Sequence, residues 1–541
     1  MQKLKLAGLS ILSGLLMGIS WPATGDLSPV FFIALIPLLY VEYTISQNPD
    51  KYKSRHVFYN AYLAFFTFNV FTLWWIWYAS EAGMIMVGII YTFFLAVTFL
   101  WFHTTKKRLG EKRGYIALII LWLGFEWLHF NWELAHPWNT IGNAFANYPE
   151  LVQWYEYTGV LGGSLWILVV NILLFKVFRK TIILGEPVKN NLKLLGIVSA
   201  ILIIPSAYSF ITYNNYSETQ NPIEIVVIQP NIDPYYDKFN NMTEAEQVDR
   251  ILSLAREKIT PNTRYILAPE TAIPRGSRES EYESNYGIME IRKLIQEFPT
   301  IKFVIGISSR IDYGLSNKKP TATSKQNGIT KEWYDSFNSA IFIDDSPTIQ
   351  TYHKSKLVLG VEKMPFTNFL APLEKFALNL GGTFGSLGVD KEARIFKDDS
   401  IGIAPVICYE SVFAGYVSSY VKKGANLIFI ITNDGWWKDT PGYKQHLSFA
   451  RLRAIETRRS IARSANTGTS CFINQKGDII NATDWWEEDA IINTLNTNDK
   501  TTFYTENGDL LGRVSAAIAV LLLLWSWTIK IKGRFIKQKN D

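Results

Sequence analysis

Long apolar runs separated by short polar stretches occupy the first 213 residues, and one more such run follows residue 511. A helix that spans a membrane needs about 20 mostly apolar residues. We expect eight such helices, at residues 4–20, 28–43, 57–78, 83–102, 115–130, 161–178, 192–212 and 512–529. The first resembles the apolar part of a signal peptide but lacks a small-residue cleavage motif, so we interpret it as a helix.

Basic residues occur in every second connection between these segments. They precede the first segment and follow the second, fourth, sixth and eighth, as Lys3, Lys5, Lys51, Lys53, Arg55, Lys106, Lys107, Arg108, Lys112, Arg113, Arg179, Lys180, Lys189, Lys530, Lys532, Arg534, Lys537 and Lys539. Connections 79–82 and 131–160 contain neither Lys nor Arg. Because cytoplasmic loops are enriched in basic residues, both chain ends are expected in the cytoplasm and the middle domain outside.

The middle of the chain has the composition and periodicity of a soluble α/β domain. Strands are predicted at 224–230, 264–268, 303–308, 340–343, 401–407, 427–432 and 469–473. Helices are predicted at 244–259, 286–297, 412–423 and 444–459, and 316–331 reads as an exposed loop. We therefore divide the chain into seven transmembrane helices (1–213), an extracytoplasmic domain (220–500), and a return segment with the eighth helix and a basic tail (501–541).

Composition narrows the possible functions. The 541 residues carry a net charge of +6, and the basic residues cluster beside the apolar runs, which favours a membrane protein over a nucleic-acid-binding one. Only two cysteines are present, so neither a disulfide framework nor a Cys-based zinc site is expected. The sequence contains no phosphate-binding glycine loop and no His-Glu-x-x-His motif, and we predict neither a metal nor a cofactor.

Three ionisable residues of the middle domain each follow a predicted or possible strand. Glu270 stands in Pro269-Glu270-Thr271, Lys354 follows Tyr352-His353, and Cys408 ends the apolar run that begins at Ile401. Residues at strand ends of an α/β sheet converge on one edge. A glutamate can deprotonate a thiol, the thiolate can attack an acyl carbonyl, and an ammonium group can stabilise the oxyanion. A helix beginning near Cys408 is expected to lower the pKa of its thiol.

Each of these residues also has a simpler interpretation. A Glu or Lys in a loop is usually solvated, and a lone Cys is usually buried core. Lys356 is a rival for Lys354, because it lies two residues further along the same extended segment. Cys471 lies in an apolar run and is interpreted as core, and His446 as a residue that orients a loop.

The connection at 131–160 is rich in aromatic residues, including Trp138. Trp and Tyr favour membrane interfaces, so this loop is either an interfacial cap or a wall of a lipid site. Glu126, near the end of the fifth segment, is either a functional carboxylate or a structural hydrogen-bond acceptor.

The middle domain resembles the nitrilase superfamily, and nearly the whole chain is similar to the apolipoprotein N-acyltransferase family. The matching stretches are Trp21-Pro22 to Pro37-Leu38, Glu126-Trp127-Leu128, Pro137-Trp138 to Gly159, Val227 to Asn231, Phe337-Asn338-Ser339, Cys408-Tyr409-Glu410, Asn433-Asp434-Gly435-Trp436, His446 to Glu456, and Tyr504 to Asp509. The resemblance implies an αββα sandwich for the middle domain.

The resemblance also implies roles for individual residues. Glu270 would be the general base, Lys354 the oxyanion lysine and Cys408 the nucleophile. Residues that would support the site or bind substrate are Glu362, Tyr409, Glu410, Trp436 and Trp138. The chain departs from the family pattern at Ala268, at Lys356 and at Leu359-Gly360-Val361, which bears on acyl-chain or head-group preference.

The expected activity is transfer of a fatty acyl chain from a membrane phospholipid, through a cysteine thioester, to the α-amino group of a diacylglyceryl-cysteine on apolipoproteins. The implied setting is the outer face of a bacterial inner membrane, with the enzyme acting as a monomer and binding no nucleic acid. The main alternative is a membrane-tethered amidase in which water takes the thioester. A catalytically silent scaffold with the same fold is a third hypothesis.

Overall fold

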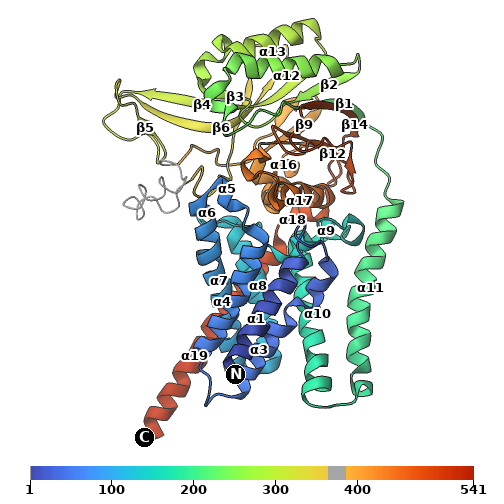
Figure 1. The fold of residues 1–541 in the computed structure, drawn as a ribbon, viewed down its shortest axis with the longest axis vertical. Helices are drawn as coiled ribbons and strands as arrows, with labels where there is room; N and C mark the ends of the chain where they lie inside the picture. Colours follow the sequence, from blue (N-terminus) through green and yellow to red (C-terminus); the bar gives the residue numbers. More distant parts are fainter. Residues whose placement is uncertain (1, 364–385, 541) are drawn as a thin grey trace. The chain divides into compact units, whose positions relative to one another are not determined.

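A computed structural model describes residues 2–363 and 386–540, with side chains of the last helix as far as Ile531. The chain forms two compact units, drawn in Figure 1. A helical unit contains Met1–Trp74, Met84–Asn214 and Asn507–Asp541. An α/β unit contains Asn215–Glu506 and, in addition, the short segment Trp75–Gly83.

Long helices make up most of the helical unit. Their bounds are α1 Gln2–Ile19, α3 Ile36–Gln47, α4 Ser54–Leu73, α7 Thr92–Leu109, α8 Glu111–Asn131, α10 Val160–Phe178, α11 Leu192–Asn215 and α19 Leu510–Asn540. Shorter helices are α2 Phe31–Ala34, α6 Glu81–Ile85 and α9 Tyr155–Thr158. Helix α1 packs closely on α4, since a Cβ added at Gly14 would lie 2.6 Å from Cβ of Thr67.

Six stretches of the described chain are long and apolar enough to cross a membrane. They are Ser28–Gln47, Glu81–Leu109, Glu111–Asn131, Val160–Ile183, Val188–Asn215 and Leu510–Ile531. The other two predicted crossings are helical as α1 and α4 but are not among these six. The prediction of eight crossings is thus supported for six by length and hydropathy.

Buried polar groups in the helical unit are held by neighbouring segments. Glu126 accepts hydrogen bonds from Trp122 Nε1 at 3.0 Å and from the backbone N–H of Ile141 at 2.9 Å. These contacts favour the structural interpretation of Glu126. Trp138 is buried, 2% exposed, and its carbonyl accepts a hydrogen bond from Asn143.

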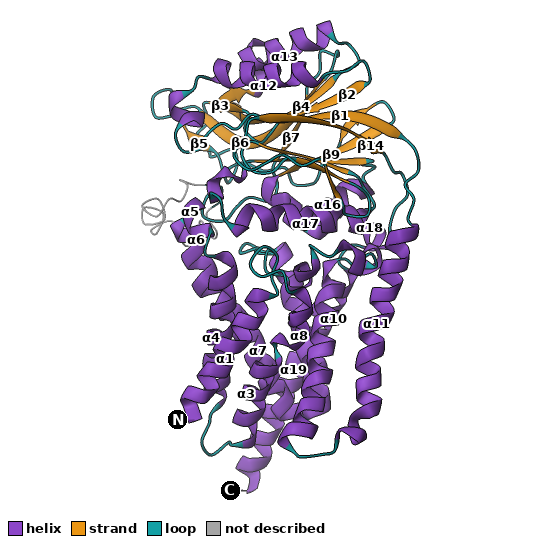
Figure 2. Ribbon diagram, turned by 45° about the vertical axis from the view of Figure 1, so that its right-hand side comes forward, coloured by secondary structure: helices purple, strands orange, loops and turns teal. Residues whose placement is uncertain are grey.

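Two sheets face one another in the α/β unit, with helices on their outer faces (Figure 2). The first runs β14-β1-β2-β4-β6-β5, with β3 on β4 and β7 on β6. Its strands are β1 Pro222–Gln229, β2 Thr263–Leu267, β3 Ile273–Arg278, β4 Lys302–Gly314, β5 Lys325–Gln326, β6 Trp333–Ile343, β7 Gln350–His353 and β14 Asp489–Asn496.

The second sheet runs β13-β12-β11-β10-β9-β8. Its strands are β8 Phe396–Asp398, β9 Ile401–Ile407, β10 Leu427–Thr432, β11 Ile461–Ala465, β12 Cys471–Ile473 and β13 Ile479–Ile480. Strands β9, β10 and β11 are parallel to one another, and β9 and β10 are mostly apolar. The sheets meet where Tyr265 of β2 packs edge-on against Phe429 of β10, with ring centroids 5.5 Å apart.

Helices α12 (Glu244–Lys258) and α13 (Tyr286–Glu297) cover the first sheet, and α16 (Ala414–Lys422) and α17 (Pro441–Thr457) cover the second (Figure 2). Helix α12 begins where Thr243 and Glu246 form a capping box. Apolar residues at helical spacing then turn one face inward, among them Val248, Ile251 and Ala255. The result is the four-layer order helix, sheet, sheet, helix.

The segment Trp75–Gly83 departs from the prediction of one helix over residues 57–78. Helix α4 ends at Leu73, and a separate short helix, α5, occupies Ile76–Ala79. The Trp75 ring packs against Trp437 at 5.1 Å, and Lys438 Nζ lies 4.5 Å from the Tyr78 ring. The carbonyl of Tyr78 also accepts a hydrogen bond from the Tyr235 hydroxyl at 3.2 Å. These aromatic contacts place the segment in the α/β unit.

Candidate active site

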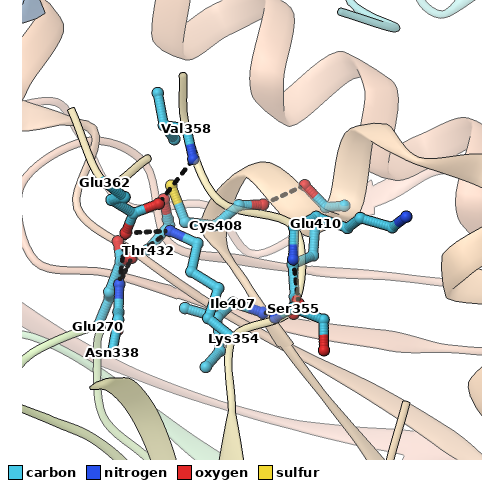
Figure 3. A network of polar contacts seen from close by, with 12 residues as sticks. Glu270, Asn338, Lys354, Ser355, Val358, Glu362, Ile407, Cys408, Glu410 and Thr432 are labelled. Atoms are coloured by element: carbon cyan, nitrogen blue, oxygen red, sulfur yellow. Dashed lines mark hydrogen bonds and ion pairs between the residues drawn. The ribbon is translucent and has the colours of Figure 1, made fainter. Parts of the chain in front are cut away.

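Strand ends bring together the three residues that the sequence analysis singled out. Glu270 follows the last residue of β2 by three positions, Lys354 comes directly after β7, and Cys408 comes directly after β9. All three residues are buried, with exposed fractions of 6%, 1% and 7%. Figure 3 shows them within one network of polar contacts. The sequence pattern therefore located residues that meet in space.

The Lys354 ammonium lies between two carboxylates. Its Nζ donates to Glu270 Oε1 at 2.9 Å and to Glu362 Oε1 at 2.8 Å. The amide of Asn338 donates to the same two oxygens, at 2.7 Å and 2.9 Å. The second oxygen of Glu362 accepts from the backbone N–H of Val358 at 2.8 Å. Glu362 thus holds both the lysine and the loop that follows it.

Electrostatics keep Lys354 protonated. Burial lowers the pKa of its ammonium, but the charges of Glu270 and Glu362 outweigh burial, so that the pKa lies well above its ordinary value. A permanently charged donor at this position suits stabilisation of an oxyanion. Lys356 takes a different position, since its Nζ lies over the rings of Phe413 and Tyr416 at 5.3 Å and 5.2 Å.

Cys408 occupies an unusual backbone conformation, with φ of 50°. Such left-handed geometry is rare for residues other than glycine, and it is characteristic of side chains held in place by their surroundings. The carbonyl oxygen of Cys408 accepts a hydrogen bond from Ser411 Oγ at 2.8 Å and lies 3.1 Å from His446 Nε2. The sharp turn presents the thiol at the end of β9.

The helix predicted at 412–423 is present as α16, which begins at Ala414. A short 3₁₀ turn, Cys408–Val412, separates this helix from the strand. The expected lowering of the thiol pKa is wrong. Burial raises the pKa of Cys408, and the charge of Glu270 adds to this effect, while Lys354 and a hydrogen bond with Thr432 oppose it. The resting residue is therefore a neutral thiol that needs a base.

Glu410 is fully buried and joins the segment after β7 to the end of β9. Its Oε1 accepts from the Tyr352 hydroxyl at 2.6 Å and from the Ser355 N–H at 2.7 Å. Its Oε2 accepts from the Ile407 N–H at 2.9 Å. Burial raises the pKa of Glu410, and these hydrogen bonds act in the opposite direction. We infer that Glu410 fixes the backbone around Lys354 and Cys408.

A second buried network contacts the backbone carbonyl of Cys408 through His446. His446 Nδ1 lies 3.1 Å from Asp434 Oδ1, and Arg463 donates to Asp434 Oδ2 at 2.6 Å. Burial raises the pKa of Asp434, but Arg463 and His446 more than reverse this, leaving the carboxyl ionised. Sequence reasoning gave His446 a loop-orienting role but missed Arg463, whose place inside a strand gave no signal of burial.

The remaining candidates fall into two groups. Tyr409 is buried and packs edge-on against Phe413 at 5.1 Å, and Cys471 is fully buried within β12. Trp436 instead lies at the surface of the α/β unit, next to the rings of Tyr235 and Phe239. Phe239 is 55% exposed. The described residues contain no group of three His, Cys, Asp or Glu side chains arranged for a metal ion.

Comparisons with known proteins match both units. Residues 13–173 match the apolipoprotein N-acyltransferase N-terminal domain, and residues 224–503 match the carbon-nitrogen hydrolase family. An apolipoprotein N-acyltransferase of Chlorobaculum tepidum is 30% identical over 95% of each chain. The chain belongs to the apolipoprotein N-acyltransferase family. Apolipoprotein N-acyltransferase 1 of Treponema denticola is 26% identical over 98% of this chain and 97% of its own.

Family membership confirms the predicted combination of an apolar helical domain with a nitrilase-type domain. An amidase from Nesterenkonia is a solved structure similar to part of the chain. It has a TM-score of 0.36 and 13% identity, covering 55% of this chain and 98% of the amidase. The family and the apolar helices identify the chain as a bacterial membrane enzyme.

Proposed function

We propose that this chain transfers a fatty acyl group from a membrane phospholipid to the α-amino group of a diacylglyceryl-cysteine at the start of an apolipoprotein. The observation that carries the proposal is the Lys354 ammonium held between Glu270 and Glu362, in the same buried network as Cys408. That network provides a base, a fixed cation and a nucleophile, which acyl transfer requires.

In the first half-reaction, Glu270 takes the proton of the Cys408 thiol as sulfur attacks the ester carbonyl of the phospholipid. The Lys354 ammonium stabilises the negative charge that develops on the carbonyl oxygen. The bond to the glycerol oxygen then breaks, and Glu270 returns the proton to that oxygen. The products are an acyl thioester on Cys408 and a lysophospholipid.

In the second half-reaction, the free α-amino group of the lipoprotein attacks the thioester carbonyl. Glu270 accepts a proton from the nitrogen, and Lys354 again stabilises the oxyanion. The carbon–sulfur bond breaks, and the proton returns to the sulfur, restoring the neutral thiol that the buried site favours. Each half-reaction leaves Glu270 and Lys354 in their starting protonation states.

The proposed location is the outer face of the inner membrane, with the enzyme acting as a monomer. The alternation of basic and Lys/Arg-free connections supports this orientation. Cysteines introduced at Ser316, in the exposed loop of the α/β unit, should react with a membrane-impermeant thiol reagent added to intact spheroplasts. Cysteines at Ser54 should react only after permeabilisation, and the reverse pattern would contradict the orientation.

A product assay separates the proposed transfer from the amidase alternative, which the family match does not favour. The purified enzyme is placed in vesicles whose phospholipid carries an isotope-labelled acyl chain, together with a diacylglyceryl-cysteine peptide. We expect the label in an amide on the peptide and an equal amount of lysophospholipid. Label recovered only as free fatty acid would show that water takes the thioester and would reject the proposal.

A further inference from the structure

Lys238 is a second buried lysine beside Glu270. It lies in the π-helical turn Asp237–Asn241 and is 1% exposed. Its ammonium donates to the backbone carbonyl oxygen of Glu270 at 3.0 Å, which is its only hydrogen bond among the described residues. Its own carbonyl accepts from Gln247 Nε2 at 2.7 Å. The backbone of Lys238 is thus held by Gln247, and its ammonium contacts Glu270, the proposed base.

The backbone of Glu270 is confined from two sides. Thr271, the next residue, has φ of 49°, in the left-handed region that most residues avoid. On one side, Gly306 of β4 approaches so closely that an added Cβ would lie 2.6 Å from Cα of Glu270. On the other side, Lys238 holds the Glu270 carbonyl. The strained turn is therefore clamped between a strand and an ammonium group.

Charge gives Lys238 a second role. The carboxylates of Glu270 and Glu362 share a single ammonium, that of Lys354, which leaves this part of the buried network with an excess negative charge. That excess would oppose the negative charge that develops on sulfur and on the carbonyl oxygen during acylation. A positive charge on Lys238 restores the balance without entering the space between the carboxylates.

Stability alone does not account for this lysine. A buried ammonium group with one hydrogen bond carries a large desolvation cost, which an apolar side chain would avoid. Burial lowers the pKa of Lys238 to about 8, while the charge of Glu270 opposes the decrease. The group therefore remains mostly protonated at neutral pH.

We propose that Lys238 is a positioning residue for acyl transfer, which fixes the Glu270 turn and balances the charge around its carboxylate. This inference rests on the proposed function for the meaning of Glu270 as the base. The charged groups that face Glu270 are Lys354 and Lys238, with Glu362 beyond Lys354 and the Cys408 thiol at the end of β9. Removing Lys238 leaves the carboxylates in excess, which disfavours the negative charge that develops on the Cys408 sulfur.

The test measures alkylation of Cys408 by iodoacetamide as a function of pH in the full-length enzyme. Alkylation depends on deprotonation of the thiol and requires no lipid, so it can be interpreted even if acyl transfer is not the natural reaction. Lys238→Met should react about tenfold more slowly at pH 7, with the acid limb of its pH–rate profile moved up by about one unit. KM for the phospholipid in acyl transfer should change less than about twofold.

The matched control is Lys302→Met, which removes a partly buried lysine of the same unit that pairs with Asp398 at 3.9 Å. Its profile should coincide with that of the unchanged enzyme. A second variant, Lys238→Arg, retains a charge and a donor and serves as the test if Lys238→Met does not fold. The acid limb of its pH–rate profile should lie at the same pH as that of the unchanged enzyme. The proposal would be overturned if the acid limb of the pH–rate profile does not move in Lys238→Met. It would also be overturned if the acid limb moves equally in Lys238→Arg.

Discussion

Glu270 and Glu410 are both buried near Cys408, yet the protein surrounds them in opposite ways. Glu270 faces the Lys354 ammonium and one side-chain amide. Glu410 faces no cation within hydrogen-bonding distance among the described residues; it accepts from tyrosine hydroxyls and backbone N–H groups. One carboxylate is surrounded by charge and the other by neutral donors.

This difference in surroundings indicates that one carboxylate takes part in the reaction and that the other holds the structure in place. A carboxylate paired with an ammonium group can exchange a proton while the local charge stays balanced by the second carboxylate, Glu362. A carboxylate that accepts several fixed N–H and O–H donors loses those bonds if it moves or changes protonation. We therefore assign proton transfer to Glu270 and the positioning of two strand ends to Glu410.

The largest expected effect separates these two residues directly. Glu270→Gln should slow acylation of Cys408 by about 10²–10⁴-fold, because general-base catalysis typically supplies that factor. Glu410→Gln should instead destabilise the fold by about 1–3 kcal/mol, because either orientation of its amide places the NH₂ group against a backbone N–H that can only donate. Single-turnover acylation, normalised to the folded fraction measured by thermal unfolding, distinguishes the two effects.

A loss of less than about tenfold per folded molecule is expected for Glu410→Gln. If that variant loses as much rate per folded molecule as Glu270→Gln, the assignment of proton transfer to Glu270 and of positioning to Glu410 is wrong. A normal acylation rate for Glu270→Gln would remove Glu270 from the mechanism.

A smaller effect is expected from the two lysines that follow β7. Lys354→Met should slow thioester formation by about 10²–10³-fold, the usual cost of removing an oxyanion donor. Lys356→Met is the matched control, because its ammonium lies over the rings of Phe413 and Tyr416. Its rate should stay within about threefold of the unchanged enzyme. Equal losses in both variants would mean that the positive charge acts only at long range.

The smallest effect concerns the residue before Lys354. His353 Nε2 lies 2.7 Å from Glu279 and Nδ1 lies 3.2 Å from Asp390. Burial lowers the pKa of His353, but Asp390 and Glu279 outweigh it and raise the pKa to about 9. The stabilisation is complete below the unfolded pKa of about 6.5 and is lost as pH rises through about 9.

The comparison variant is His353→Gln, which cannot be protonated. The difference in free energy of unfolding between the unchanged protein and this variant should decrease by about 3 kcal/mol from pH 6 to pH 10. Thermal unfolding in detergent at both pH values measures the change. A difference that is independent of pH would show that His353 is not charged in the folded protein.

Local pattern predicted the strands before Glu270 and Cys408, whereas β7, which precedes Lys354, was not among the predicted strands. Apolar runs at Thr263–Leu267 and Ile401–Ile407 end abruptly in polar residues, so Glu270 and Cys408 could be located from the sequence. The carboxyl ends of strands meet at one edge of an α/β sheet, which made their proximity predictable. The helices α12 and α13 were predicted within a residue or so, because capping residues precede amphipathic runs.

Long-range pairing was not predictable in the same way. Strand β14 pairs with β1 from the other end of the domain, with Pro222 opposite Asn496, and no local pattern encodes that partner. Strand β11 reads Ile-Ala-Arg-Ser-Ala and includes a charge, Arg463, which is buried only because Asp434 of another segment pairs with it. Lys238 was missed for the same reason, since a lysine beside an aromatic residue usually lies at the surface.

The protonation state of Cys408 also depends on three-dimensional surroundings. The sequence indicated a thiol at a strand end but could not reveal that burial and Glu270 together raise its pKa. This outcome makes the base a requirement, because no preformed thiolate is available to attack the ester.

The most direct test is the mass of the peptide that contains Cys408, measured after incubation with phospholipid and again after addition of a diacylglyceryl-cysteine peptide. The account predicts an acyl thioester on Cys408 in the first sample and its disappearance in the second, with an equal gain of acyl amide on the added peptide. Cys408→Ser should show neither, whereas Cys471→Ser, altered in the core of β12, should show both. An acyl group attached elsewhere, or still formed in Cys408→Ser, would contradict the account.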